Sequence, residues 1–188
     1  MFKRLLGTVL AASFLFAGAA QAADYDVDGA HAFAVFKVMH LGVAPSYGQF
    51  VKVGGSLQVD GEELKALAIE IDTASIFSAN KKRDDHLKGP DFFDVKQFPK
   101  ATFKATKIEK AGDKAFKVTG DMTIKGKTQS ITLDATMTGA GTDPWGNERV
   151  GFEANFKIDR MAFGVDYMPD GLGKQVDFMV ALEGIKKK

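Results

Sequence analysis

Three histidines are the side chains of this sequence best suited to metal binding or proton transfer. His31, His40 and His86 lie far apart, without the H-x-H or H-x-x-x-H spacing that brings two ring nitrogens to one ion. The chain has no cysteine, which excludes disulfides, thiolate ligands and thiol nucleophiles. No G-x-S-x-G motif indicates an activated serine. We therefore expect no metal, no catalytic cofactor and no enzyme, with a small enzyme using histidine and aspartate as the alternative.

Two arginines stand beside aspartates. Arg83 begins the motif RDDHL, which also holds His86, and Arg160 follows Asp159 in the motif IDR. A guanidinium makes forked hydrogen bonds to phosphate or carboxylate, so either arginine could meet an anionic ligand. The alternative is structural, because ion pairs with neighbouring aspartates are the commoner reason for an arginine near a loop.

The first 22 residues have the pattern of an export signal. A basic start precedes an apolar run over residues 5–16, and Ala-Gln-Ala at residues 20–22 ends it. The run is too short to cross a hydrocarbon layer of about 30 Å. We expect residues 1–22 to be removed and residues 23–188 to form a single domain in the periplasm.

The charge of the predicted mature chain is close to neutral. Removing the two basic residues of the signal leaves 23 Lys and Arg against 24 Asp and Glu. A near-neutral protein has no electrostatic attraction to nucleic acid, so we expect no nucleic-acid partner.

Alternation of apolar and polar residues predicts strands along most of this domain. In residues 116–125, Phe116, Val118, Met122 and Ile124 face one way and polar residues the other. Similar runs cover residues 32–40, 48–59, 67–72, 101–109, 131–138, 150–158 and 176–182. Short turns between them indicate an antiparallel meander. An all-β barrel of about eight strands buries all these apolar faces and leaves no exposed edge; a sandwich is the alternative.

The segment RDDHLKGPDFFDVKQFPKATF at residues 83–103 breaks the alternation. Ser78 can cap a helix that ends before Pro90. Phe92, Phe93 and Phe98, which follow Pro90, cannot all face water at low cost. We predict a short helical insertion and an aromatic loop that close one end of the barrel as a lid.

Four motifs resemble the YceI-like family. They are the segment above, YDVDGAHAFAVFKVMHLG at 25–42, GDMTIKGKTQSITLDA at 120–135 and DPWGNERVGFEANFKIDRMAFGV at 143–165. The resemblance covers the predicted mature chain in order. It implies a lipocalin-like antiparallel barrel, exported to the periplasm, that holds a long amphiphile in an apolar channel. The implied ligand is a polyisoprenoid of quinone or polyprenyl phosphate type, or a fatty acid or fatty amide.

Apolar stripes usually form a filled core, and a small barrel either is packed solid or holds one ligand. With the resemblance, a channel becomes the preferred interpretation, and a filled barrel acting as an interaction or stress-response module stays an alternative. The candidates for contact with a lipid tail are Phe33, Val35, Phe92, Phe93, Phe103, Phe116, Met122, Phe152, Phe156 and Phe163. The candidates for the head group are Arg83, His86 and Arg160. We expect lipid exchange with membranes, and the sequence leaves open whether two barrels form a homodimer.

Overall fold

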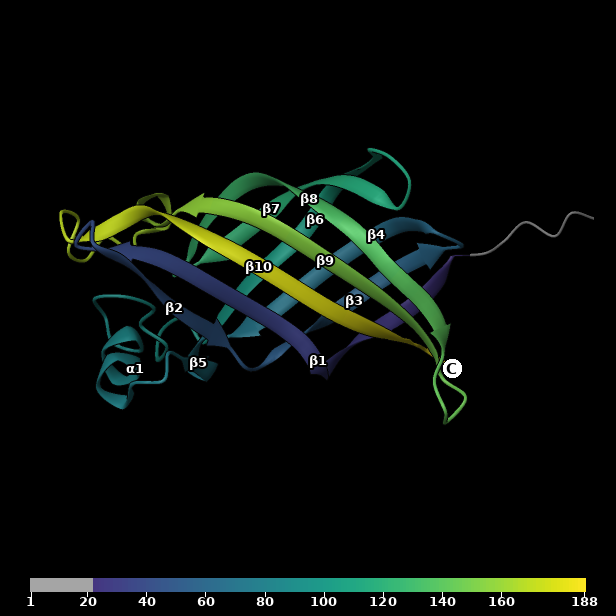
Figure 1. The fold of residues 1–188 in the computed structure, drawn as a ribbon, viewed down its shortest axis with the longest axis horizontal. Helices are drawn as coiled ribbons and strands as arrows, with labels where there is room; N and C mark the ends of the chain where they lie inside the picture. The colour runs from purple at the N-terminus through teal and green to yellow at the C-terminus, as the bar shows by residue number, and fades with distance from the viewer. Residues whose placement is uncertain (1–21) are drawn as a thin grey trace, which may run out of the picture.

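The computed structural model describes residues 22–188, so the predicted signal peptide lies outside the described part except for Ala22. Ten strands, two 3-10 helices and one short α-helix make up the fold within these residues (Figure 1). In chain order they are β1 (Ala23–His40), β2 (Ala44–Phe50), β3 (Val53–Asp60), β4 (Glu63–Asp72), η1 (Thr73–Ser75), β5 (Ile76–Phe77), α1 (Lys81–Leu87), β6 (Lys100–Lys110), β7 (Ala115–Ile124), β8 (Lys127–Thr142), β9 (Glu148–Asp159), η2 (Arg160–Phe163) and β10 (Leu172–Lys186).

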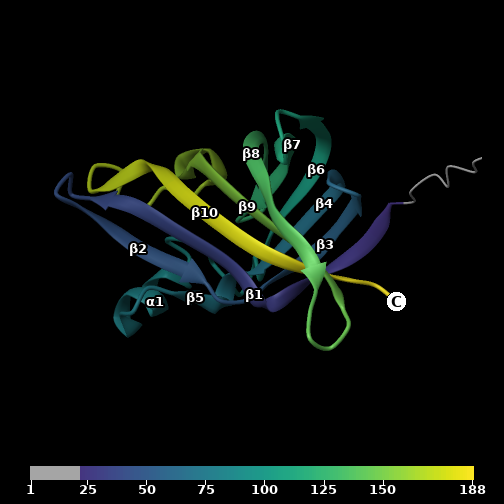
Figure 2. The ribbon, with the colours of Figure 1, turned by 45° about the vertical axis from the view of Figure 1, so that its right-hand side comes forward.

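Eight of the strands close into an antiparallel barrel, which confirms the predicted fold class. Around the barrel the order is β10, β9, β8, β7, β6, β4, β3 and β1, and β10 pairs with β1 to complete the circle. Strands β2 and β5 extend the sheet beside the second half of β1, on the side where α1 lies (Figure 2). Closure gives each of the eight strands a paired neighbour on both sides and removes the free edges that an open sheet would expose.

The run 48–59, predicted as one strand, is divided between β2 and β3. The break falls at Val51 and Lys52, whose N–H groups donate to the carbonyl oxygen and the hydroxyl of Ser75, respectively. These two donors are therefore bound by the η1 turn and are withdrawn from a continuous strand ladder.

The alternation of β7 shows why these residues form a barrel wall. Phe116 and Val118 are almost fully buried and lie opposite Ala135 and Leu133 of β8. Lys117 between them points outward and contacts Asp134. Burying one face of each strand in this way stabilises the barrel by about 25 cal/mol for each Å² of apolar surface removed from water.

Residues 78–99 connect β5 to β6 and contain α1, at the end of the barrel where β10 begins (Figure 1). The helix is capped by Asn80, whose side chain accepts from the Arg83 N–H, and not by Ser78 as predicted. Ser78 is instead buried against Asp84, which accepts from its N–H and hydroxyl groups. Within residues 22–188, none of the helices has the length and apolar character needed to span a bilayer.

Candidate functional site

Two adjoining apolar cavities lie at the α1 end and in the middle of the barrel. The outer cavity has a volume of about 390 Å³ and lies between α1, the first turn of the following loop, and strands β1, β2, β9 and β10. The inner cavity, of about 90 Å³, lies inside the barrel. Phe93, Ile124 and Phe178 line both, so the two spaces meet at these side chains.

The inner cavity is lined by five of the predicted tail-contact residues, Phe93, Phe103, Met122, Phe152 and Phe156. Phe156 stacks on Phe178, with ring centroids 5.4 Å apart. Phe116, another predicted contact, is 2% exposed, packs against Phe152 and lines neither the inner nor the outer cavity. We therefore expect it to belong to the packed core.

Phe33 and Val35, two further predicted contacts, lie outside the two cavities. They belong to the outward face of β1, and Phe33 is 51% exposed. The inward face carries Ala34, Phe36 and Val38, and each of these lines one of the cavities. Both faces of β1 are apolar in this stretch, so alternation predicts the strand without telling which face is buried.

The aromatic loop after α1 forms one wall of the outer cavity, together with the predicted Phe163. Phe92 is buried, and Phe93 meets the ring of Phe50 edge-on at 5.3 Å. His86 of α1 lies edge-on to Phe92 and to Tyr167, at centroid distances of 5.1 and 5.0 Å. Tyr167 was not predicted, because it lies in a loop without periodicity. These contacts join α1 to the loop over residues 164–171 and cover the cavity.

Arg83 lines the outer cavity and has N–H groups that are not engaged by the described residues. Its Nε donates to the Ser78 hydroxyl at 2.7 Å and its Nη2 donates to the Ser78 carbonyl oxygen. Ser78 is held in turn by Asp84. Three of the five guanidinium N–H groups find no partner among residues 22–188, and no carboxylate there forms an ion pair with Arg83. The side chain is therefore oriented by Ser78 and open to an acceptor in the cavity.

Arg160 lines the same cavity, but its five N–H groups all point to backbone carbonyl oxygens. The acceptors, at 2.6 to 3.4 Å, belong to Val165, Tyr167, Met168, Leu172 and Gly173. Burial lowers the pKa of this guanidinium from its ordinary value. Arg160 therefore holds the loop over residues 164–171 to the start of β10, and it has no N–H group left for a head group.

Two of the three histidines, His40 and His86, line the outer cavity. His86 Nε2 lies 2.8 Å from Asp91 Oδ2, on the exposed side of the insertion. In the part of the chain that the structure describes, neither histidine hydrogen-bonds to a serine hydroxyl, and the Ser78 hydroxyl is engaged by Asp84 and Arg83. The arrangement can bind a polar group but lacks an activated serine.

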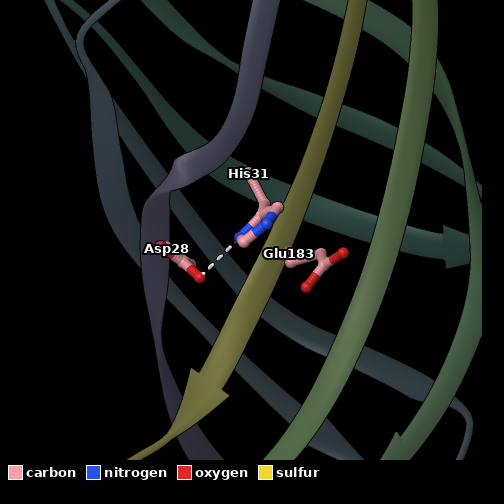
Figure 3. Close-up of side chains that lie close together, drawn as sticks. All are labelled: Asp28, His31 and Glu183. Atoms are coloured by element: carbon pink, nitrogen blue, oxygen red, sulfur yellow. Dashed lines mark hydrogen bonds and ion pairs between the residues drawn. The ribbon is translucent and has the colours of Figure 1, made fainter. Parts of the chain in front are cut away.

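His31 lies near the opposite end of the barrel, in a cluster with Asp28 and Glu183 (Figure 3). An irregularity in the pairing of β1 with β10, between Val27 and Ala32, brings His31 Nδ1 to 2.9 Å from Asp28 Oδ2. The donor atoms of the three residues lie within 4.8 Å of one another.

The centre of this cluster is already occupied by a cation. Arg149 Nη1 donates to Asp28 and to Glu183 at 2.8 Å, and its Nε donates to Asp143. The hydrogen bonds from His31 and Arg149 lower the pKa of Asp28 to about 2. A metal ion would have to compete with the guanidinium for the same carboxylate oxygens. We assign the cluster a structural role, because it links β1, β9 and β10 at this end of the barrel.

The closed barrel, the apolar cavity and the covering helix define a lipocalin-like protein with one short helical insertion. The YceI-like domain model matches residues 25–184, and the chain belongs to this family. It is 38% identical over 192 residues to the Escherichia coli O157:H7 protein YceI, with all of both chains covered.

The fold is also found in solved structures. The crystal structure of Burkholderia cenocepacia BcnA has a TM-score of 0.75 and 28% identity, covering 84% of this chain and 98% of that one. A distant structural relative is a polyisoprenoid binding domain from Saccharophagus degradans implicated in plant cell wall breakdown, with a TM-score of 0.66 and coverage of 89% and 100%. At 12% identity, this likeness shows the fold alone.

Proposed function

We propose that this protein is a periplasmic carrier for a long-chain amphiphile, most simply a polyisoprenoid of quinone or polyprenyl phosphate type. The observation that carries the proposal is the outer cavity of about 390 Å³ beneath α1, which is apolar for most of its wall and adjoins the inner cavity at Phe93, Ile124 and Phe178. Its volume lies in the range of about 300–1,000 Å³ usual for small-molecule sites. The predicted export signal supports the location, and the distant polyisoprenoid binding domain supports the ligand class.

The energetics favour a long tail and a reversible association. Each buried methylene contributes about 0.8 kcal/mol, so one five-carbon isoprene unit contributes roughly 3–4 kcal/mol. Association and ordering of the tail together cost on the order of 4–15 kcal/mol. Several units are therefore needed for binding from water. A lipid that already lies in a bilayer gains little on transfer, which suits a protein that exchanges lipid with membranes.

The head group belongs near α1, where the polar side chains of the cavity gather. Ser46, Tyr47, Arg83 and His86 line this part of the wall. Arg83 has three N–H groups free within the described chain, which favours a head group with acceptor oxygens, such as phosphate, carboxylate or a quinone carbonyl. Arg160 has none free, so its role is to hold the loop.

Binding without chemistry fits these side chains better than catalysis. A hydrolytic site needs a nucleophile or a bound water beside a base, and the histidines of the cavity contact aromatic rings and Asp91. We therefore infer that the protein is not an enzyme. The alternative ligand, a fatty acid or fatty amide, differs in its unbranched tail and in its carboxylate or amide head group.

The test is to isolate the mature protein from a bacterial periplasm, extract it with organic solvent and identify the lipid by mass spectrometry. Native mass spectrometry of the same sample gives the stoichiometry. We expect one isoprenoid lipid of several units per chain. Arg83→Gln keeps the cavity and removes the charge, so it should lose anionic lipids selectively. Repeated recovery of lipid-free protein would overturn the carrier function, and a fatty acid in the extract would replace the isoprenoid.

A further inference from the structure

Two turns beside the outer cavity expose apolar side chains at the same end of the barrel. Leu41 and Val43, in the turn between β1 and β2, are 55% and 83% exposed. Tyr167 and Met168, in the loop over residues 164–171, are also exposed. The turns are joined, because the Leu41 N–H donates to the Gly171 carbonyl oxygen at 2.7 Å. We call these four side chains the apolar tip; both turns project at the far left of Figure 1.

The backbone of the apolar tip makes the choice of residues unusual. Leu41 and Met168 have φ angles of 52° and 53°, in the left-handed region. Turns that need this conformation ordinarily use glycine, asparagine or aspartate, and a bulky side chain there is disfavoured. Large apolar residues at two such exposed positions therefore oppose both folding and solubility. This indicates that the side chains serve to contact another molecule.

The apolar tip is continuous with the wall of the cavity. Tyr167 and Met168 line the outer cavity and are at the same time exposed, as is Tyr47 of β2. Apolar surface therefore runs from the cavity onto the end of the barrel. The exposed charged residues of the adjoining loop and strand are Asp166, Asp170 and Lys174, which do not form a patch of one sign.

We propose that the apolar tip inserts into a lipid bilayer and places the opening of the outer cavity at the membrane surface. Leucine, valine and methionine suit the acyl region, and tyrosine suits the head-group level. A second copy of this chain is a poorer occupant, because a stable dimer buries about 800 Å² on each partner and four partly exposed side chains on two turns offer far less. The bilayer is the source and destination of the ligand, so this part of the inference rests on the proposed function.

The test is co-flotation of the mature protein with uncharged phosphatidylcholine vesicles. The affinity of the variant L41D/V43D for the vesicles should be lower by about tenfold or more, because the substitutions remove apolar surface from the insertion. Aspartate tolerates the left-handed region, so the Leu41 turn should still fold, which circular dichroism checks. The matched control is Trp145→Ser, which removes the 81% exposed tryptophan of the β8–β9 turn at the opposite end and should bind as the wild type does.

Trp145 also reports which end meets the membrane, because it is the one tryptophan of the sequence. Its emission should not change when vesicles are added, whereas a Leu41→Trp reporter in a Trp145→Phe background should shift to the blue. Absence of flotation by the wild type, or a blue shift of Trp145 with flotation lost in Trp145→Ser, would overturn the proposal. A dimer in solution that L41D/V43D converts to a monomer would assign the tip to a second copy instead.

The outcomes for the tip and for the proposed function are separable. Leu41 and Val43 do not line the outer or the inner cavity, so L41D/V43D should keep its co-purified lipid and lose only vesicle binding and transfer. Lipid-free wild type that still floats with vesicles would overturn the carrier function and leave the insertion standing. Lipid-loaded wild type that never floats would overturn the insertion alone.

Discussion

Replacing Arg160 with methionine tests whether this guanidinium is a structural group or a head-group contact. The substitution keeps an unbranched apolar stem, shorter than arginine, and removes all five donors. Each lost hydrogen bond leaves a carbonyl oxygen of the loop or of β10 without its partner. The prediction is a large loss of stability with no direct effect on the chemistry of the cavity.

The magnitude follows from how many of the five acceptors water can reach. The carbonyl groups of Tyr167 and Met168 belong to exposed residues and can be hydrated after the substitution. Those of Val165, Leu172 and Gly173 belong to buried or half-buried residues. At about 1–2 kcal/mol for each, the three give a loss of roughly 3–6 kcal/mol. For a domain of this size, that corresponds to a fall in melting temperature of roughly 6–24 °C.

The assay is urea unfolding of the mature chain followed by circular dichroism, together with the lipid content of each preparation. Arg83→Met is the matched control, since that side chain is exposed and is bound only to Ser78. We expect the control to lose less than about 1 kcal/mol. If Arg160→Met were no less stable than Arg83→Met, or if it lost lipid at unchanged stability, the structural assignment of Arg160 would be refuted.

Three further predictions concern the cavity, the packed core and the opposite end. Val38→Trp should fill the outer cavity and lower co-purified lipid about tenfold, with the free energy of unfolding changed by less than about 1.5 kcal/mol; normal lipid content would contradict the site. Phe116→Ala should lose about 3–5 kcal/mol in urea unfolding and keep its lipid, and the reverse pattern would place Phe116 in the channel. Arg149 helps to hold the pKa of Asp28 at about 2, below its ordinary 3.8, so the ionised carboxylate stabilises the fold above pH 4 and this contribution is lost as the pH falls through 2. In melting curves from pH 6 to pH 2, Arg149→Met should therefore be less stable than the wild type at pH 6, with a difference that shrinks on acidification; a constant difference would count against this coupling.

The barrel itself could be predicted because its information is local. Residues such as Phe116, Lys117 and Val118 alternate between burial and exposure, and this period of two is set by the pleat of a strand wherever the strand lies. The break in the alternation after Ser78 likewise predicted the helical insertion. A chain with one apolar face on most of its strands must bury those faces together, and closure is the arrangement that also satisfies the edges.

The site needed the tertiary structure, because a cavity is a property of side chains that meet across the barrel. Phe103 and Phe116 have the same pattern in sequence, yet one lines the inner cavity and the other packs solidly. On β1, apolar residues occupy both faces, and only its pairing with β2 and β10 decides that Phe36 points inward and Phe33 outward. The sequence by itself determined that a closed barrel with an insertion forms. The packing of distant strands decided where that barrel is hollow.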